Sequence, residues 1–303
     1  MDIKTILKKI KYNEGTFPRE AVNEAIKNQE LIIPELLKII EFTKDNIEEL
    51  NEDEEYFAHI YAMYLLSQFR EKSAHQLITD FFSIYEDIPL NITGEVVTED
   101  LSRILASVYD GNDNLIKSLI ENKELNEYVR AAALESLLVL VAAGIKPREK
   151  IISYFKELFN GKLEREFSYV WNTLIMRSTS LYPKEVYDEI KLAYRDDLIE
   201  AFFIDLQTVE EVIKKGKEKT LRKLQNDSRY TLIKDTISEM QNWNCFQRSI
   251  DKKIKYEDTN NPENTKNKDT QSISTTKKRK KVGRNAPCPC GSKKKYKKCC
   301  LNK

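Results

Sequence analysis

Four cysteines near the end of the sequence have the residue type and the spacing of a metal site. Cys288 and Cys290 are separated by one residue, Cys299 and Cys300 are adjacent, and eight residues lie between the two pairs. A turn at Gly291-Ser292 can bring the four sulfur atoms to the corners of one tetrahedron, which is the geometry of structural zinc sites. We therefore expect bound zinc, and a set of four thiolates also suits iron.

The segment around these cysteines is strongly basic. Residues 277–303 hold 12 Lys and Arg and no Asp or Glu, a charge density that attracts polyanions by releasing their counterions. About 20 residues cannot build a core, so we expect metal binding and folding to be one event. The side chains expected to contact a partner are Arg284, Lys294, Lys295, Tyr296, Lys297 and Lys298. The alternative is a tail that only increases solubility.

The same segment resembles a known module. Gly283-Arg-Asn, Pro287-Cys-Pro-Cys-Gly-Ser and Lys294-Lys-Tyr-Lys-Lys-Cys-Cys are similar to the SEC-C motif, named from the C-terminus of the SecA translocation ATPase. The resemblance implies that the four cysteines are the metal ligands. It also implies partners such as the SecB chaperone and ribosomes. Two positions depart from the motif, since Cys300 stands where some members have His and Lys293 replaces a common Gly.

The charge divides the chain into two regions. Residues 1–250 hold 33 basic and 44 acidic side chains, a net charge of −11, whereas residues 251–303 hold 17 and 5, a net charge of +12. Residues 251–282 lack apolar periodicity and cannot bury enough surface to fold, so they predict a disordered basic linker before the module at 283–303. No apolar stretch approaches the roughly 20 residues of a membrane span, and the start lacks a signal peptide. A cytoplasmic protein is expected.

The first 250 residues predict an all-α domain, because apolar residues recur at helical spacing almost throughout. Pro18, Pro34, Pro147 and Pro183 each precede an apolar helical stripe, and the last two are 36 residues apart. This period favours a HEAT-like helical-repeat solenoid, with a compact non-repeating bundle as the alternative. Helix pairs are expected at about 19–42, 55–85, 99–121, 127–159 and 166–194, with further helices to about 242.

Residues 12–215 also resemble a bacterial family, the domain of unknown function 1186. The resemblance rests on four runs: Gly15-Thr-Phe-Pro-Arg-Glu-Ala, Tyr56-Phe-Ala-His-Ile-Tyr-Ala-Met-Tyr-Leu-Leu-Ser-Gln-Phe-Arg-Glu, Gly94-Glu-Val-Val-Thr-Glu-Asp-Leu-Ser-Arg-Ile-Leu-Ala-Ser and Asn126-Glu-Tyr-Val-Arg-Ala-Ala-Ala-Leu. It implies a helical-repeat scaffold that often precedes a small metal motif. It implies no activity.

Few residues of the helical region are arranged for catalysis or metal binding. His59 is expected to be a core histidine and His75 to take part in capping a helix. The run from Asp110 to Glu121 has the oxygen-bearing residues of a calcium loop, but Leu115 stands where that loop needs Gly, so a turn and a capped helix are expected. We expect Cys245 to be a small packed residue.

The acidic run from Glu48 to Glu55 is expected to be solvated, with docking of a basic partner as the alternative. Taken together, the sequence favours a non-enzymatic adaptor, in which the helical scaffold is tethered to a zinc module that docks on a chaperone, ribosome or protein-export machinery. The first alternative is non-specific RNA or DNA binding through the basic tail. The second is an enzyme with its site in the groove of the solenoid.

Overall fold

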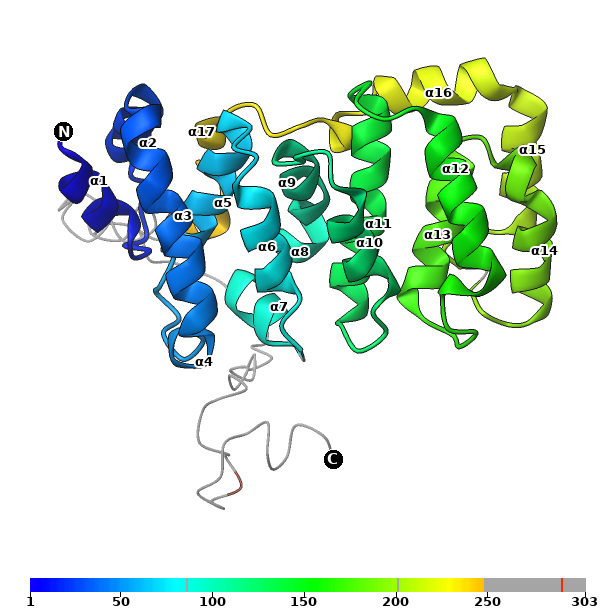
Figure 1. The fold of residues 1–303 in the computed structure, drawn as a ribbon, viewed down its shortest axis with the longest axis horizontal. Coiled ribbons are helices and arrows are strands. Elements are labelled where there is room, and N and C mark those ends of the chain that lie inside the picture. The colour runs from blue at the N-terminus through cyan, green and yellow to red at the C-terminus, as the bar shows by residue number, and fades with distance from the viewer. Residues whose placement is uncertain (86, 201, 248–289, 291–303) are drawn as a thin grey trace, which may run out of the picture. The chain divides into compact units, whose positions relative to one another are not determined.

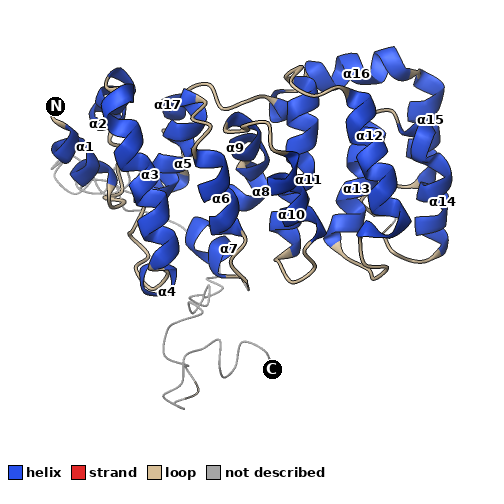
Figure 2. Ribbon diagram, viewed as in Figure 1, coloured by secondary structure: helices blue, strands red, loops and turns tan. Residues whose placement is uncertain are grey.

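The computed structural model describes residues 1–247 apart from Glu86 and Ala201, and also Cys290. In this part of the chain all regular structure is helical, with 17 α-helices (Figure 2). No strand occurs within it, where the single β contact is an isolated bridge between Tyr12 and Tyr56. The prediction of an all-α fold is confirmed. The chain divides into two units at residues 1–254 and 255–303, and the description below concerns the first.

The helices are α1 (Ile3–Ile10), α2 (Arg19–Lys27), α3 (Gln29–Asp45), α4 (Ile47–Leu50), α5 (Ala58–Phe69), α6 (Ala74–Phe82), α7 (Ile88–Thr93), α8 (Val96–Glu99), α9 (Leu101–Ser107), α10 (Asp113–Glu121), α11 (Glu127–Ala142), α12 (Arg148–Glu157), α13 (Tyr169–Ser180), α14 (Tyr187–Arg195), α15 (Leu206–Lys215), α16 (Lys217–Gln225) and α17 (Thr236–Met240). All five predicted helix pairs are present.

In the helical unit, the helices from α1 to α15 follow one another in a row across the view of Figure 1. Polar contacts link each part of the row to the next over similar sequence separations. For example, His75 contacts Asp110, 35 residues later, and Tyr154 contacts Glu121, 33 residues earlier. These separations are close to the 36-residue spacing between Pro147 and Pro183. The row is therefore built from successive helix pairs, and its assignment to the HEAT class stays a prediction.

Two buried arginines form the strongest of these links. The guanidinium of Arg130 in α11 donates to both carboxylate oxygens of Glu164, at 2.6 and 2.8 Å, and its Nε donates to the Ile120 carbonyl. Arg148 in α12 binds Glu185 in the same way, at 2.7 Å to each oxygen. Planar, two-point pairing of this kind fixes the relative orientation of the elements that it joins.

The hydrophobic core runs the length of the row. Helix α11 is buried on nearly every face and packs against α9, α10 and α13. Pro34 departs from the prediction, because it lies inside α3 and does not begin a helix. The break comes earlier, at Asn28, whose side chain donates to the Glu24 carbonyl at the end of α2. The capping bond at Asn28, and not the proline, separates the two helices.

Residues 226–247 form a return segment that the sequence did not predict. After α16 the chain runs back along the row to the neighbourhood of α2 and α5 (Figure 1). The Ile233 amide donates to Ser107 Oγ, and the Thr236 amide donates to the Gln68 side chain, 168 residues earlier. The segment ends where Phe246 packs against Phe17. The return segment therefore joins the far end of the row to its beginning.

The described helices include none that is long and apolar enough to cross a membrane.

Candidate functional site

The predicted metal site lies almost wholly outside the described residues. Cys290 is exposed in a turn, whereas Cys288, Cys299 and Cys300 are not described, and neither are the six predicted partner-contacting residues from Arg284 to Lys298. The chemistry of the donor set fits zinc, because four thiolates make a complete tetrahedral shell. The ligand assignment, the linker at 251–282 and the module boundaries stay predictions.

His59 is a core histidine, as predicted. Its ring lies between those of Tyr56 and Phe81, with centroids 5.4 and 6.3 Å away. Its Nε2 lies 3.1 Å from the carbonyl oxygen of Ile92, so the ring holds α5 against the end of α7. Burial lowers the pKa of His59 to about 4, so the imidazole stays neutral near pH 7.

The prediction for His75 is wrong. The preceding Ser73 stands at the N-cap of α6 but makes no side-chain capping bond, and its hydroxyl donates to Glu71 instead. His75 is fully buried, and its Nδ1 lies 2.8 Å from a carboxylate oxygen of Asp110. The histidine therefore joins α6 to the turn before α10, a tertiary role that its place at a helix start conceals.

The calcium-like run forms a turn and a capped helix, as predicted. The side chain of Asn112 accepts from the Asn114 amide at the start of α10, while Asp110 faces His75. Asp113 pairs with Lys146 at 2.5 Å. Within the described part of the chain, no group of three or more His, Cys, Asp or Glu side chains is placed to hold a metal ion.

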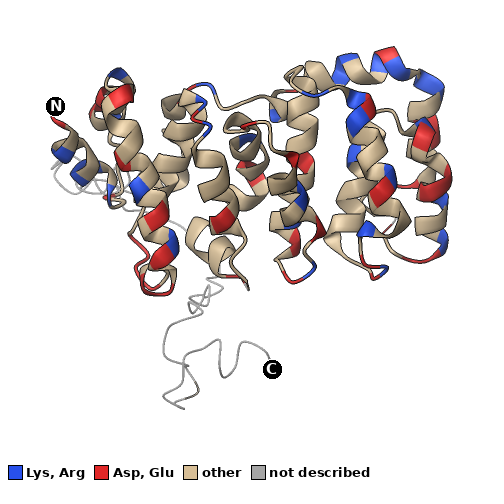
Figure 3. Cartoon of the chain, in the orientation of Figure 1, with Lys and Arg blue, Asp and Glu red and all other residues tan. Residues whose placement is uncertain are grey.

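The acidic side chains from Glu48 to Glu55 are exposed, as predicted, with Glu48 and Glu49 in α4 and the others in the loop that follows it (Figure 3). Asp53 accepts a hydrogen bond from the amide of Glu55 within this loop. Docking of a basic partner at this run stays a prediction.

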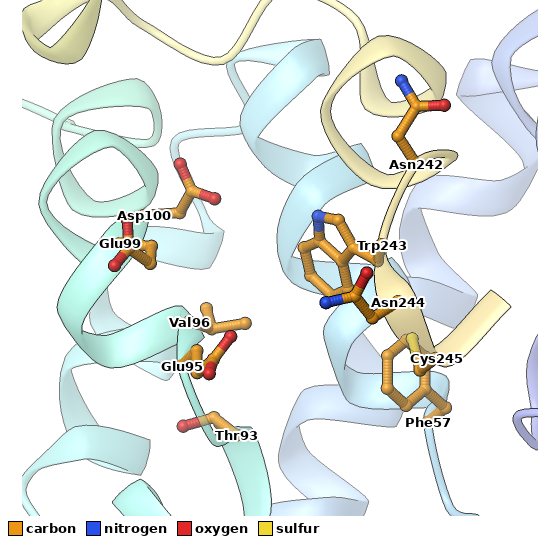
Figure 4. A pocket seen from close by; sticks show the side chains of 10 residues that line it. All are labelled: Phe57, Thr93, Glu95, Val96, Glu99, Asp100, Asn242, Trp243, Asn244 and Cys245. Carbon is orange, nitrogen blue, oxygen red and sulfur yellow. The ribbon is translucent and has the colours of Figure 1, made fainter. Parts of the chain in front are cut away.

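The return segment closes one side of a cavity of about 390 Å³. The opposite side comes from the short helix α8 and the start of α9, and Phe57 before α5 completes the lining. Figure 4 shows the carboxylates of Glu95, Glu99 and Asp100 on one side of this space and the indole of Trp243 on the other. Carboxylates opposite an aromatic ring are the groups that bind a cation such as a lysine or arginine side chain.

The three carboxylates differ in their partners. Asp100 accepts hydrogen bonds from the hydroxyl of Tyr64 and, at 2.7 Å, from Arg103 Nη1. Burial and the neighbouring Asp100 carboxylate raise the pKa of Tyr64, which keeps its hydroxyl protonated as the donor. Glu95 and Glu99 are exposed at the rim of the cavity. Negative charge is therefore concentrated at the mouth.

Arg103 also attaches the return segment. Its Nη2 and Nη1 donate to the Glu239 carboxylate at 2.6 and 2.9 Å, and its Nε donates to the Thr231 carbonyl at 2.9 Å. Burial acts to lower the pKa of Arg103, but the hydrogen bonds and negative charges of Glu239 and Asp100 together outweigh burial and raise the pKa. The guanidinium stays charged and holds the cavity wall in place.

Sequence reasoning missed this cavity because its two sides are far apart in the chain. Cys245 does pack against the core, as predicted, but it also borders the cavity. The signal available in the sequence was the cluster Trp243, Cys245 and Phe246 beyond the last predicted helix. Apolar residues at that position need a partner surface, and that surface is formed by residues near Phe57.

Comparisons with known proteins follow the same division of the chain. A family model described as a protein of unknown function, DUF1186, matches residues 1–247, and a model of the SEC-C motif matches residues 284–302. An uncharacterized protein of Chlamydia trachomatis is 43% identical over 244 residues, which cover 80% of this chain and 96% of that one. A Chlamydia muridarum protein is 43% identical over 244 residues, covering 80% and 97%. No solved structure matches.

The SEC-C segment has relatives of another kind. The protein translocase subunit SecA of Desulforudis audaxviator is 83% identical over 24 residues, which cover 8% of this chain and 3% of SecA. The two chlamydial proteins, in contrast, consist almost entirely of the helical domain. Both resemblances stated from the sequence are confirmed, and the chain belongs to the DUF1186 family and carries a SEC-C motif after its helical domain.

Proposed function

We propose that this chain is a non-enzymatic adaptor, in which the helical domain binds one partner and the zinc-loaded SEC-C module binds another. The observation that carries the proposal is the separate distribution of the two parts. The helical domain makes up 96% of a chlamydial relative, while the module shares 24 residues with SecA, a protein of which they are 3%. Parts that occur apart have separable roles, and a chain that joins them can link two partners.

The module would bind its partner through shape and charge together. Zinc held by Cys288, Cys290, Cys299 and Cys300 would supply the fold of a segment too short to have a core. The basic side chains around it would then meet an acidic surface in a fixed arrangement. SecA is a protein translocase subunit, so a chaperone, a ribosome or the export machinery is the class of partner proposed here.

The helical domain would contribute the cavity between α8 and the return segment. Glu95 and Glu99 at its mouth and the ring of Trp243 in its wall suit a lysine or arginine side chain of the second partner. His59 Nε2 contacts Ile92 and His75 Nδ1 contacts Asp110, whereas His59 Nδ1 and His75 Nε2 are buried and have no hydrogen-bond partner within the described residues. These contacts support a structural role for both histidines and agree with a scaffold that binds without catalysing.

A variant series with purified ribosomes, and separately with a purified SecB-type chaperone, tests the proposal. The double variant Cys299→Ser/Cys300→Ser should lose binding although every basic side chain remains. Ser272→Ala/Ser274→Ala is the matched control, because it is a double change outside the cysteine motif and should bind normally. A second double variant, Lys294→Gln/Lys297→Gln, should weaken binding while keeping the metal.

Nucleic-acid binding is the competing function, favoured by the 12 Lys and Arg of residues 277–303. In that case the cysteine variant would still bind ribosomes, and binding would fall steeply with salt in proportion to the number of phosphate contacts. Undiminished ribosome binding by Cys299→Ser/Cys300→Ser would therefore reject the adaptor in favour of an electrostatic arm.

A further inference from the structure

A second cavity, of about 610 Å³, lies near α15 and α16, at the opposite end of the row from Phe246. It is bordered by α13, α15 and α16, by residues between α14 and α15, and by Asp227, Arg229 and Tyr230 at the start of the return segment. Its volume falls within the range of roughly 300–1,000 Å³ that small-molecule sites occupy. Five basic side chains line it, namely Arg177, Lys215, Lys219, Lys223 and Arg229, against one acidic side chain, Asp227.

Three of these cations are matched by carboxylates. Arg177 pairs with Glu135, Lys215 with Glu211 and Arg229 with Asp227, at 3.0, 3.6 and 2.7 Å. Within the described residues, Lys219 and Lys223 form no ion pair. The lining thus carries more positive than negative charge in a region whose net charge is −11, with Lys223 acting on the nearby Asp227 through charge alone.

Helix stability does not account for Lys219, whereas Lys223 lies in the last turn of α16, where the helix dipole favours positive charge. Both lie on α16, where Figure 3 shows basic residues along the helix. Lys219 is the third residue of α16, in the first turn, where the helix dipole disfavours positive charge. Lys219 and Lys223 are also four residues apart, so the two like charges are neighbours on one face and repel each other. An anion between them would remove both costs.

Arg177 adds a second, independent observation. Its Nη1 donates to the Tyr230 hydroxyl at 2.9 Å and its Nη2 to Glu135 at 3.0 Å. Its Nε, however, is buried and has no hydrogen-bond partner in the described structure. A buried donor left without an acceptor is costly, and an acceptor in the cavity that Arg177 lines could relieve that cost.

The rest of the lining is largely apolar. Met176, Ile204 and Val212 contribute to it, and so does Phe203. The Phe203 ring lies 5.8 Å from that of Phe202, which is 91% exposed. The apolar wall therefore continues onto an exposed aromatic surface. A ligand that fits both parts carries an anionic head and an apolar body.

We propose that this cavity binds a small amphiphilic anion, with a carboxylate or phosphate head at Lys219 and Lys223 and an apolar body against Met176, Phe203 and Val212. The site is separate from the metal module and from the cavity beside Trp243. The proposal gives the helical domain a small-molecule ligand of its own, and it does not depend on whether the basic tail binds a protein or a nucleic acid.

The test uses the full zinc-loaded chain and the fluorescent aromatic sulfonate 1-anilinonaphthalene-8-sulfonate as the first probe. Decanoate, decyl phosphate and the neutral decanol then compete for its site. We expect saturable binding of the probe, and displacement by both anions at lower concentration than by decanol. The more effective anion identifies the head group as carboxylate or phosphate. Equal displacement by decanol would overturn the proposal, because charge would then play no part.

Charge reversal locates the site. Lys219→Glu/Lys223→Glu should weaken binding of the probe and of both anions by roughly tenfold or more, because two attractive charges become repulsive. Both side chains are exposed, so the variant should keep its helical circular dichroism. Lys214→Glu/Arg222→Glu is the matched control, with the same charge change on α15 and α16 outside the lining, and should bind normally. Equal affinity of the two double variants would also overturn the proposal.

Discussion

Replacing Phe246 by Ala should release the return segment from the row. The Phe246 side chain is 4% exposed, and its ring centroid lies 5.4 Å from that of Phe17, 5.8 Å from that of Phe57 and 6.4 Å from that of Tyr61. Deleting a buried phenylalanine ring costs about 3–5 kcal/mol. That is a large share of the roughly 5–15 kcal/mol that stabilises a typical domain. Because Phe246 lies at the end of the segment, local release should precede global unfolding.

The two tryptophans of the chain allow local release to be measured. Trp171 is 1% exposed in α13, and Trp243 lies in the return segment next to Phe246. In a Trp171→Phe background, fluorescence reports Trp243 alone. Phe246→Ala should shift its emission to longer wavelength and increase quenching by acrylamide, at urea concentrations below the main transition seen by circular dichroism.

The control is Phe202→Ala in the same background, which deletes the same ring from a position that is 91% exposed. It should change stability by less than about 0.5 kcal/mol. If Phe246→Ala behaved like Phe202→Ala in both measurements, the return segment would not be anchored as described, and the cavity beside Trp243 would lose its wall.

Three further outcomes are expected. Arg130 holds Glu164 in a two-point pair, and although burial acts to raise the pKa of Glu164, its hydrogen bonds and the positive charge of Arg130 together lower it below its ordinary value of 4.5. The pair should therefore stabilise the fold above pH 4.5 and lose that contribution as the pH falls through the lowered pKa. Glu164→Gln should cost about 3 kcal/mol in urea unfolding at pH 7 and flatten this acid dependence, and an unchanged pH profile would contradict the assignment. Trypsin should cut first within residues 252–281, since exposed lysines of a linker are cleaved before packed ones, and a first cut inside the helices would refute the domain boundary. Elemental analysis of protein purified without chelator should find one zinc per chain, lost in Cys290→Ser with no change in the melting of the helices, whereas metal-free wild-type protein would reject the site.

The sequence predicted those parts of the fold whose signals are local. The predicted helix pair at about 127–159 is present as α11 and α12, and the helical conformation ends at Asn160 and Gly161, where Gly161 has a φ of 120°. Pro34 misled because a proline usually lies before a helix or in its first turn, where its missing N–H has no helical partner to lose. In α3 it is the sixth residue.

The tertiary contacts were beyond local reasoning. His75 binds Asp110 and the return segment binds residues such as Gln68, so these roles depend on elements that fold together from distant parts of the sequence. The second cavity could not be predicted for the same reason. In the sequence Lys219 is an ordinary charged residue of a helix, and only the fold shows that α13 and α15 form a cavity beside it. The cysteine motif could be recognised from the sequence alone, because the local spacing of its four cysteines is enough to identify it.

The most direct test of the two-part account measures binding of the intact chain to its purified target before and after metal removal. A chelator should abolish binding to the ribosome or chaperone while the helical circular dichroism stays unchanged, and added zinc should restore the original affinity. Binding that persists without metal, with all the basic side chains of residues 277–303 in place, would contradict the account.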